Sequence, residues 1–139
     1  AASPTSKSTG AGEGLFLFLA ECIRDTIVWM GDEPSPKDPH RLGFTFSFPC
    51  EQTAVNKGSL VWWTKGFTCP GVEGEEVVAL LQRALGRPEV GVSVVVEALV
   101  NDTVGTLVAA KRSDPACVMG IIFGTGTNAC YVERVSQIP

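Results

Sequence analysis

An asparagine and an aspartate stand side by side at the end of an apolar run. In LVNDTVGTL, residues 99–107, Asn101 and Asp102 follow apolar residues and have no charged neighbour to pair with. Asn and Asp are favoured helix N-caps, because their side-chain oxygens accept backbone N–H groups. A carboxylate at the end of a strand can also serve as a general base. Capping is the commoner role, so this motif taken alone leaves both roles open.

Two further apolar runs end on polar residues in the same way. FSFP, residues 46–49, carries Ser47, and VMGIIF, residues 118–123, runs into the segment Gly124, Thr125, Gly126, Thr127 and Asn128. Glycines that alternate with threonines offer backbone N–H groups and hydroxyls to an anion such as phosphate. The segment is not a Walker loop, because GxxxxGK[ST] is absent. Taken alone, the segment is more often a plain tight turn than a phosphate-binding loop.

These polar residues need elements to position them, and the spacing of apolar residues predicts which. The fourfold recurrence of Leu15, Leu19, Ile23 and Ile27 predicts a helix to about Met30. Acidic residues at the start and Gly86 at the end indicate a second helix over 71–86. A third helix is expected to begin near residue 103. Residues 1–14, which are rich in Ser, Thr, Gly and Ala, are expected to form a flexible lead-in.

Strands are predicted between these helices. Residues 42–48 alternate polar and apolar types, which predicts a strand with one buried face carrying Phe44, Phe46 and Phe48. Further strands are predicted over 59–65, 92–100 and 118–123. Strands that alternate with helices indicate an α/β fold, in which ligands bind at the carboxyl ends of strands.

Composition excludes several classes of function. The 139 residues carry a net charge of −4 with scattered basic residues, which argues against a nucleic-acid surface. The five cysteines are odd in number and form no CxxC, and His40 is the single histidine, so free thiols are favoured over disulfides and no metal site is expected. The apolar run at 15–20 is too short to span a membrane.

Four linked blocks carry a resemblance to a known family. The stretch LGFTFSFPCEQTAVNKGSLVWWTKGF, residues 42–67, closely resembles the pattern of the hexokinases, the ATP-dependent hexose kinases of the actin-like ATPase superfamily. GVEGEEVVALLQRAL, LVNDTVGTL and GTGTNACYVER follow in the family's order. TGAGEGLFLFLAE is similar to a helix opening of the family, although Leu17 stands where an Asp is usual. The resemblance covers residues 9–139 and is closest to plant or algal members.

The resemblance implies roles for individual residues. Asp102 matches the general base that takes the proton of the sugar 6-hydroxyl, and Asn101 matches its partner in gripping the 4- and 6-hydroxyls. The other positions that match sugar-binding residues are Ser47, Phe48, Thr64, Lys65 and Asn128. Gly124, Thr125, Gly126 and Thr127 match the nucleotide-binding loop. Without the resemblance, Lys65 would be an ordinary solvated charge, and Trp62 and Trp63 ordinary packing residues.

The resemblance also implies an organisation, a cofactor and a setting. The fold is expected to be part of the ribonuclease H-like, actin-like ATPase fold, with the small domain at 15–100 and the hinge and first strands of the large domain at 101–139. ATP, with Mg²⁺ held mainly through the nucleotide, and a glucose-like hexose are the expected ligands. The location is expected to be cytoplasmic, with an organelle-associated form as the alternative. A non-catalytic sugar-binding or sugar-sensing module is the alternative function.

The family's other site residues lie outside these motifs. An upstream Asp-x-Gly-Gly-Thr loop, two downstream glutamates and the adenosine-binding segment have no counterpart here, and the sequence starts without Met. We therefore expect the remainder of a hexokinase chain to accompany these residues. Glu97 departs from the family within VVVEALV. Because a buried, unpaired carboxylate is costly, Glu97 is expected to have an exposed face or a partner.

Overall fold

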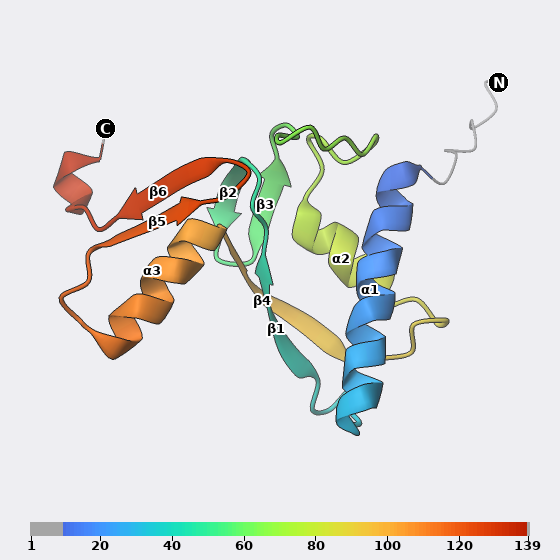
Figure 1. Ribbon diagram of the computed structural model, residues 1–139. Coiled ribbons are helices and arrows are strands. Elements are labelled where there is room, and N and C mark those ends of the chain that lie inside the picture. The colour runs from blue at the N-terminus through green and yellow to red at the C-terminus, as the bar shows by residue number, and fades with distance from the viewer. Residues whose placement is uncertain (1–9, 139) are drawn as a thin grey trace. The chain divides into compact units, whose positions relative to one another are not determined.

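Helices and strands are interleaved along the chain in a computed structural model that describes residues 10–138 (Figure 1). The helices are α1 (Ala11–Met30), α2 (Val77–Leu85) and α3 (Asp102–Ser113), with a 3₁₀ turn, η1, at Val135–Gln137. The strands are β1 (His40–Thr45), β2 (Cys50–Ala54), β3 (Lys57–Leu60), β4 (Val94–Val100), β5 (Met119–Phe123) and β6 (Thr127–Tyr131). The strands pair as β1–β4, β2–β3 and β5–β6.

The described chain divides into two compact units. Unit 1 holds residues 10–44 and 48–99, and unit 2 holds residues 45–47 and 100–138. Each unit is therefore built from segments that are distant in sequence. The expected domain limits, 15–100 and 101–139, stay a prediction.

The helix α1 begins earlier than its apolar stripe predicts. It starts at Ala11, so part of the expected lead-in is helical, and residues 1–9 lie outside the described residues. Its most buried side chains are Phe16 and Ala20, next to the predicted stripe, whereas Leu15 is half-buried. The helix ends as predicted, because Gly31 adopts φ 71° and donates its N–H to the carbonyls of Ile27 and Val28.

The helix α2 is shorter than predicted. Residues 71–76 form turns in which Gly71 and Gly74 have φ 82° and 79°, and the helix starts only at Val77. The cap is Glu76, whose carboxylate accepts hydrogen bonds from the backbone N–H groups of Val78 and Ala79 at 3.0 and 2.8 Å. Val77, Leu81 and Leu85 then face the core of unit 1 with Leu60 and Val96. Figure 1 shows α1 beside α2.

The strands β1 and β4 run parallel. His40 N donates to Ser93 O and Phe46 N donates to Val100 O, so the bonds advance in the same direction along both strands. The predicted alternation is present over residues 42–46, where Leu42, Phe44 and Phe46 are more buried than Arg41, Gly43 and Thr45. It does not extend to Phe48, because Ser47 and Phe48 are both half-buried. The regular strand ends at Thr45, three residues before the predicted end.

A hairpin replaces the second predicted strand. The structure has β2 and β3 joined at Val55 and Asn56, and β3 ends at Leu60 rather than continuing through 65. The strand β2 was not predicted, because most of its residues are exposed and show no alternation of buried and exposed positions. Gln52 Nε2 donates to Leu99 O at 2.8 Å, and Leu99 N donates to Val55 O at 2.7 Å. These bonds tie the hairpin to the last residues of β4 in unit 1.

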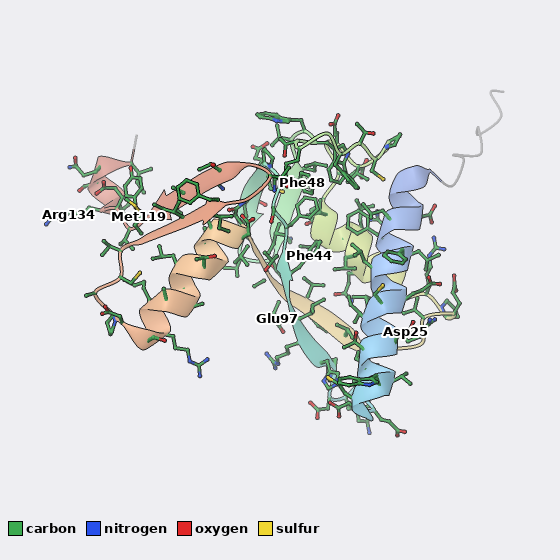
Figure 2. The ribbon with its side chains drawn as sticks, viewed as in Figure 1. Asp25, Phe44, Phe48, Glu97, Met119 and Arg134 are labelled. Carbon is green, nitrogen blue, oxygen red and sulfur yellow. The ribbon has the colours of Figure 1, made fainter. Side chains whose placement is uncertain are left out.

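Glu97 has both an exposed side and a partner. Its side chain is 49% exposed and lies 3.4 Å from Arg41 Nη1, across the β1–β4 pair. Figure 2 shows Glu97 on the side of the strand that faces away from α1. The departure from the family pattern therefore introduces no buried charge.

The described residues include no helix that is long and apolar enough to cross a bilayer, and no cluster of three His, Cys, Asp or Glu that could hold a metal. All five cysteines are free thiols. The strand β5 is predicted correctly apart from its first residue, but most of its residues are exposed.

Candidate active site

The junction between β4 and α3 places Asn101 and Asp102 in different roles. Asn101 is the N-cap of α3, with extended backbone (φ −71°, ψ 149°), and its Oδ1 accepts a hydrogen bond from Thr103 N at 3.1 Å. Asp102 is the first helical residue and is half-buried. The capping role proposed for the pair is therefore performed by its first member.

Asp102 retains one carboxylate oxygen for other chemistry. Its Oδ1 accepts a hydrogen bond from Thr103 N at 2.9 Å. Its Oδ2 accepts no hydrogen bond from the part of the chain that the structure describes. A carboxylate oxygen that is not used in hydrogen bonds within the protein can take a proton from a bound hydroxyl.

Asn128 lies against Asn101, although the two residues are 27 positions apart. Its Nδ2 donates to Asn101 Oδ1 at 3.1 Å and to Thr103 Oγ1 at 3.2 Å, and its Oδ1 accepts from Ala129 N at 2.9 Å. Asn128 occupies β6 opposite Ile122 of β5, so the β5–β6 hairpin brings it to the first turn of α3. Two residues that were singled out separately in the sequence thus form one group in unit 2.

Ser47 also belongs to unit 2. Phe46, the residue before it, donates its backbone N–H to Val100 O at 2.9 Å, and Val100 immediately precedes Asn101. Ser47 and Asn101 therefore leave the parallel pair at the same end, which is where ligands bind in α/β proteins.

The glycine–threonine segment is the tight turn of the β5–β6 hairpin. Gly124 N donates to Gly126 O at 3.0 Å, and Phe123 pairs with Thr127. The residues Gly124, Thr125, Gly126 and Thr127 are all exposed. The turn interpretation is therefore right about the backbone, and the exposed hydroxyls remain available for the predicted contact with nucleotide phosphate.

Phe48, Thr64 and Lys65 lie in unit 1, around the loop that follows β3. Lys65 has φ 61° and Gly66 has φ 71°, and Phe67 N donates to Thr64 O at 3.0 Å to close a turn. A lysine in the left-handed region is unusual and costs about 1 kcal/mol or more. Its Nζ lies 5.5 Å from the centre of the Phe48 ring. Lys65 is thus more than a solvated charge.

An aromatic cluster of Phe48, Trp63 and Phe67 holds this loop. The Phe48 and Trp63 rings meet edge to face at 4.7 Å, and Trp63 and Phe67 lie 4.8 Å apart (Figure 2 labels Phe48). Trp63 Nε1 donates to Cys69 O, and Trp63 N donates to Glu73 Oε1, both at 2.9 Å. Trp63 is therefore a packing residue, as expected, whereas Trp62 is 55% exposed.

The predicted sugar-binding residues fall into two groups. Ser47, Asn101, Asp102 and Asn128 belong to unit 2, and Phe48, Thr64 and Lys65 belong to unit 1. That all seven bind one hexose stays a prediction. Thr103 and Glu73 were not predicted from the sequence as residues of this region. The signal for Thr103 was its spacing: it lies four residues before Leu107, so both side chains lie on the buried face of α3.

Comparisons with known proteins define the class to which this arrangement belongs. A solved hexokinase from Schistosoma mansoni, complexed with glucose, superposes with a TM-score of 0.83 at 44% identity, and the match covers 98% of this chain and 30% of that chain. A second solved hexokinase matches with a TM-score of 0.74 at 40% identity. The chain therefore has part of the mixed α/β actin-like ATPase fold.

Sequence comparisons identify the family within that class. Residues 1–112 match one family model described as hexokinase, and residues 118–139 match a second. Hexokinase-1 of Schizosaccharomyces pombe is 46% identical over 137 residues, which are 98% of this chain and 28% of that protein. Mouse hexokinase HKDC1 is 46% identical over 99% of this chain and 14% of its own length. The chain belongs to the hexokinase family.

Proposed function

We propose that the protein containing this chain transfers the γ-phosphoryl group of ATP to the 6-hydroxyl of a hexose, with glucose as the substrate. The observation that carries the proposal is the division of roles at the β4–α3 junction. Asn101 caps the helix, so the Asp102 carboxylate keeps Oδ2 available at a ligand-binding strand end. The glucose complex of the Schistosoma mansoni relative supports this choice of substrate.

The chemistry requires a base at this position. A sugar hydroxyl has a pKa far above neutral, so a carboxylate that accepts its proton during attack on the γ-phosphorus lowers the barrier. Asn101 and Asn128 supply carboxamides, which pair with sugar hydroxyls and discriminate against sugars that lack them. Lys65, Thr64, Phe48 and Ser47 are proposed to complete the binding of the same sugar.

The nucleotide is proposed to contact the turn at residues 124–127. Two threonine hydroxyls and two glycines are exposed there, which suits contact with phosphate oxygens. ATP supplies the phosphoryl group, and Mg²⁺ neutralises its charge. Because phosphate oxygens are hard ligands that suit Mg²⁺, we propose that Mg²⁺ would be held mainly through the nucleotide.

The test uses the full-length protein that contains these residues, since the chain spans about 30% or less of the relatives it matches. Glucose phosphorylation with Mg-ATP is measured for the wild type and for Asp102→Ala. We expect kcat to fall about 10²- to 10⁴-fold, the usual effect of removing a general base, with glucose affinity only moderately weakened. Asp102→Asn, which preserves shape but cannot take the proton, should lose as much.

Two outcomes would contradict the proposal in different ways. A near-normal kcat for Asp102→Ala with a lowered thermal midpoint would make Asp102 a structural residue. A wild-type protein that binds glucose in calorimetry without phosphorylating it would indicate the sugar-sensing alternative.

A further inference from the structure

Thr103 is a polar residue with a buried side chain. Its side chain is 1% exposed, and it is the only buried polar side chain within residues 10–138. A buried hydroxyl needs hydrogen-bond partners, because an unpaired one loses its hydration without compensation. The partners that Thr103 uses are therefore informative.

Both partners are carboxamides of the candidate active site. Thr103 Oγ1 donates to Asn101 Oδ1 and accepts from Asn128 Nδ2 at 3.2 Å. A hydroxyl has one donor and can accept as well, so this group satisfies itself by bridging the two asparagines. Thr103 thus links the N-cap of α3 to β6.

The backbone of Thr103 is held by the β5–β6 hairpin. Cys130 Sγ donates to Thr103 O at 3.1 Å. Gly120 approaches so closely that a Cβ there would lie 2.8 Å from Thr103 O. Thr103 is therefore fixed from two sides within unit 2, and its hydroxyl has little freedom to move away from the asparagines.

This arrangement decides which end of the Asn101 side chain can meet a ligand. Asn101 Oδ1 accepts from Thr103 N, Thr103 Oγ1 and Asn128 Nδ2. With its oxygen turned inward, Asn101 presents its Nδ2 hydrogens outward as donors. The torsion that rotates a carboxamide is broad, so without such bonds the group could present either end.

We propose that Thr103 is a positioning residue for hexose binding, which fixes Asn101 so that it donates to a sugar oxygen. The proposal rests on the proposed function and adds a residue that touches no substrate. If Thr103 lacks its hydroxyl, Asn101 loses one of three restraints and Asn128 loses one of its two acceptors. Sugar affinity should then fall, while the nucleotide contacts at residues 124–127 are unaffected.

The experiment compares two pairs of variants in the full-length protein. The first pair is the wild type and Thr103→Val, which lacks the hydroxyl but has nearly the same shape. The second pair is Thr103→Ser and Thr103→Ala, which both lack the methyl group and differ only in the hydroxyl. We expect the variant without the hydroxyl in each pair to have a glucose KM about tenfold higher, the effect of one lost hydrogen bond in a buried group. Thr103→Ser should stay within about threefold of the wild type, and KM for ATP should be unchanged.

A double-mutant cycle tests whether Thr103 acts through Asn101. If it does, adding Thr103→Val to Asn101→Ala should raise the glucose KM by less than about twofold, because coupled residues are not additive. Thr26→Val is the matched control. Thr26 donates to the carbonyl of Cys22 within α1 and touches none of these residues, so its removal should leave glucose KM unchanged.

Each failure has its own signature. A wild-type protein that neither phosphorylates nor binds glucose overturns the proposed function and the role of Thr103 with it. An active wild type whose Thr103→Val and Thr103→Ala variants keep normal glucose KM overturns the Thr103 proposal alone. Equal losses for Thr103→Ser and Thr103→Ala, or additive effects with Asn101→Ala, would make Thr103 a purely structural residue. If Thr103→Val does not fold, the serine and alanine pair decides.

Discussion

For single residues, Asn101 has an observed structural role and a proposed binding role. Its Oδ1 caps α3 and accepts a hydrogen bond from Asn128, and its Nδ2 is the group that we propose for sugar binding. These two contributions can be separated, because serine is also a good N-cap but has no carboxamide.

We expect Asn101→Ser and Asn101→Ala to differ in stability and to agree in sugar binding. Asn101→Ala should lower the free energy of unfolding by about 1 kcal/mol through the lost cap, and Asn101→Ser should lose less. Both should weaken glucose affinity, with a smaller loss of kcat than Asp102→Ala. Chemical denaturation and steady-state kinetics of the full-length protein measure the two effects. Unchanged glucose affinity in both variants would exclude Asn101 from the sugar site.

Two thiols are expected to react slowly. Burial raises the pKa of Cys69, and burial together with the negative charge of Glu76 raises the pKa of Cys50. Because the thiolate is the reactive form, a raised pKa lowers its population at neutral pH and moves the increase in rate to more alkaline pH. Peptide mapping after iodoacetamide treatment should show both labelled later than the exposed Cys22.

Glu76→Gln provides the matched control for this expectation. It removes the negative charge near Cys50 and leaves the burial of both thiols, so Cys50 should label faster and Cys69 should not change. Equal acceleration of both thiols would indicate local unfolding instead of an electrostatic effect.

At the scale of elements, Glu76 joins α2 to the β2–β3 hairpin. Its Oε1 accepts from Gly58 N at 3.1 Å and from Val78 N at 3.0 Å, while Oε2 accepts from Ala79 N. Gly58 also lies close to Leu99, because a Cβ on residue 58 would lie only 2.7 Å from Leu99 Cδ2. One carboxylate therefore stabilises the start of the helix and the hairpin beside it.

We expect Glu76→Ala to lower the free energy of unfolding by about 1–2 kcal/mol, the upper range for a lost N-cap. Thermal denaturation followed by circular dichroism measures this loss. The neighbouring exposed Glu75→Ala is the control and should change stability by less than about 0.5 kcal/mol. Equal effects of the two substitutions would show that Glu76 acts only through its surface charge.

At the scale of the whole molecule, large apolar side chains remain on the surface of both units. Trp29 of unit 1 is 85% exposed, and Phe123 of unit 2 is 81% exposed. Trp29 has exposed apolar neighbours, Val28 and Met30, at the end of α1, and a contiguous apolar patch often marks a contact surface. In the relatives, the part that this chain does not match has more than twice as many residues as the part that it matches.

We therefore expect a polypeptide of these 139 residues, expressed alone, to bind a hydrophobic dye and to self-associate. Light scattering after size exclusion and dye fluorescence measure both properties. Trp29→Lys combined with Phe123→Lys should reduce them if these surfaces cause the association. A monodisperse chain without dye binding would contradict the expectation.

Most of the local elements, and the family, can be predicted from the amino-acid sequence. Apolar spacing predicts α1 and β1, and the motif at Asn101 and Asp102 lies at a strand–helix junction as expected. These features depend on neighbours along the chain, so a pattern of a few residues suffices. The exposed strand β2 lacks such a pattern, which is why it was missed.

Contacts between residues that are distant in sequence depend on the tertiary structure. Asn101 rather than Asp102 is the N-cap of α3, and Thr103 bridges Asn101 to Asn128. Glu97 pairs with Arg41, which is 56 positions away along the chain. Each outcome depends on hydrogen bonds or ion pairs between segments that are brought together by packing. Residue types show that such groups need partners, but the partner is selected by the geometry that strands and helices create between them.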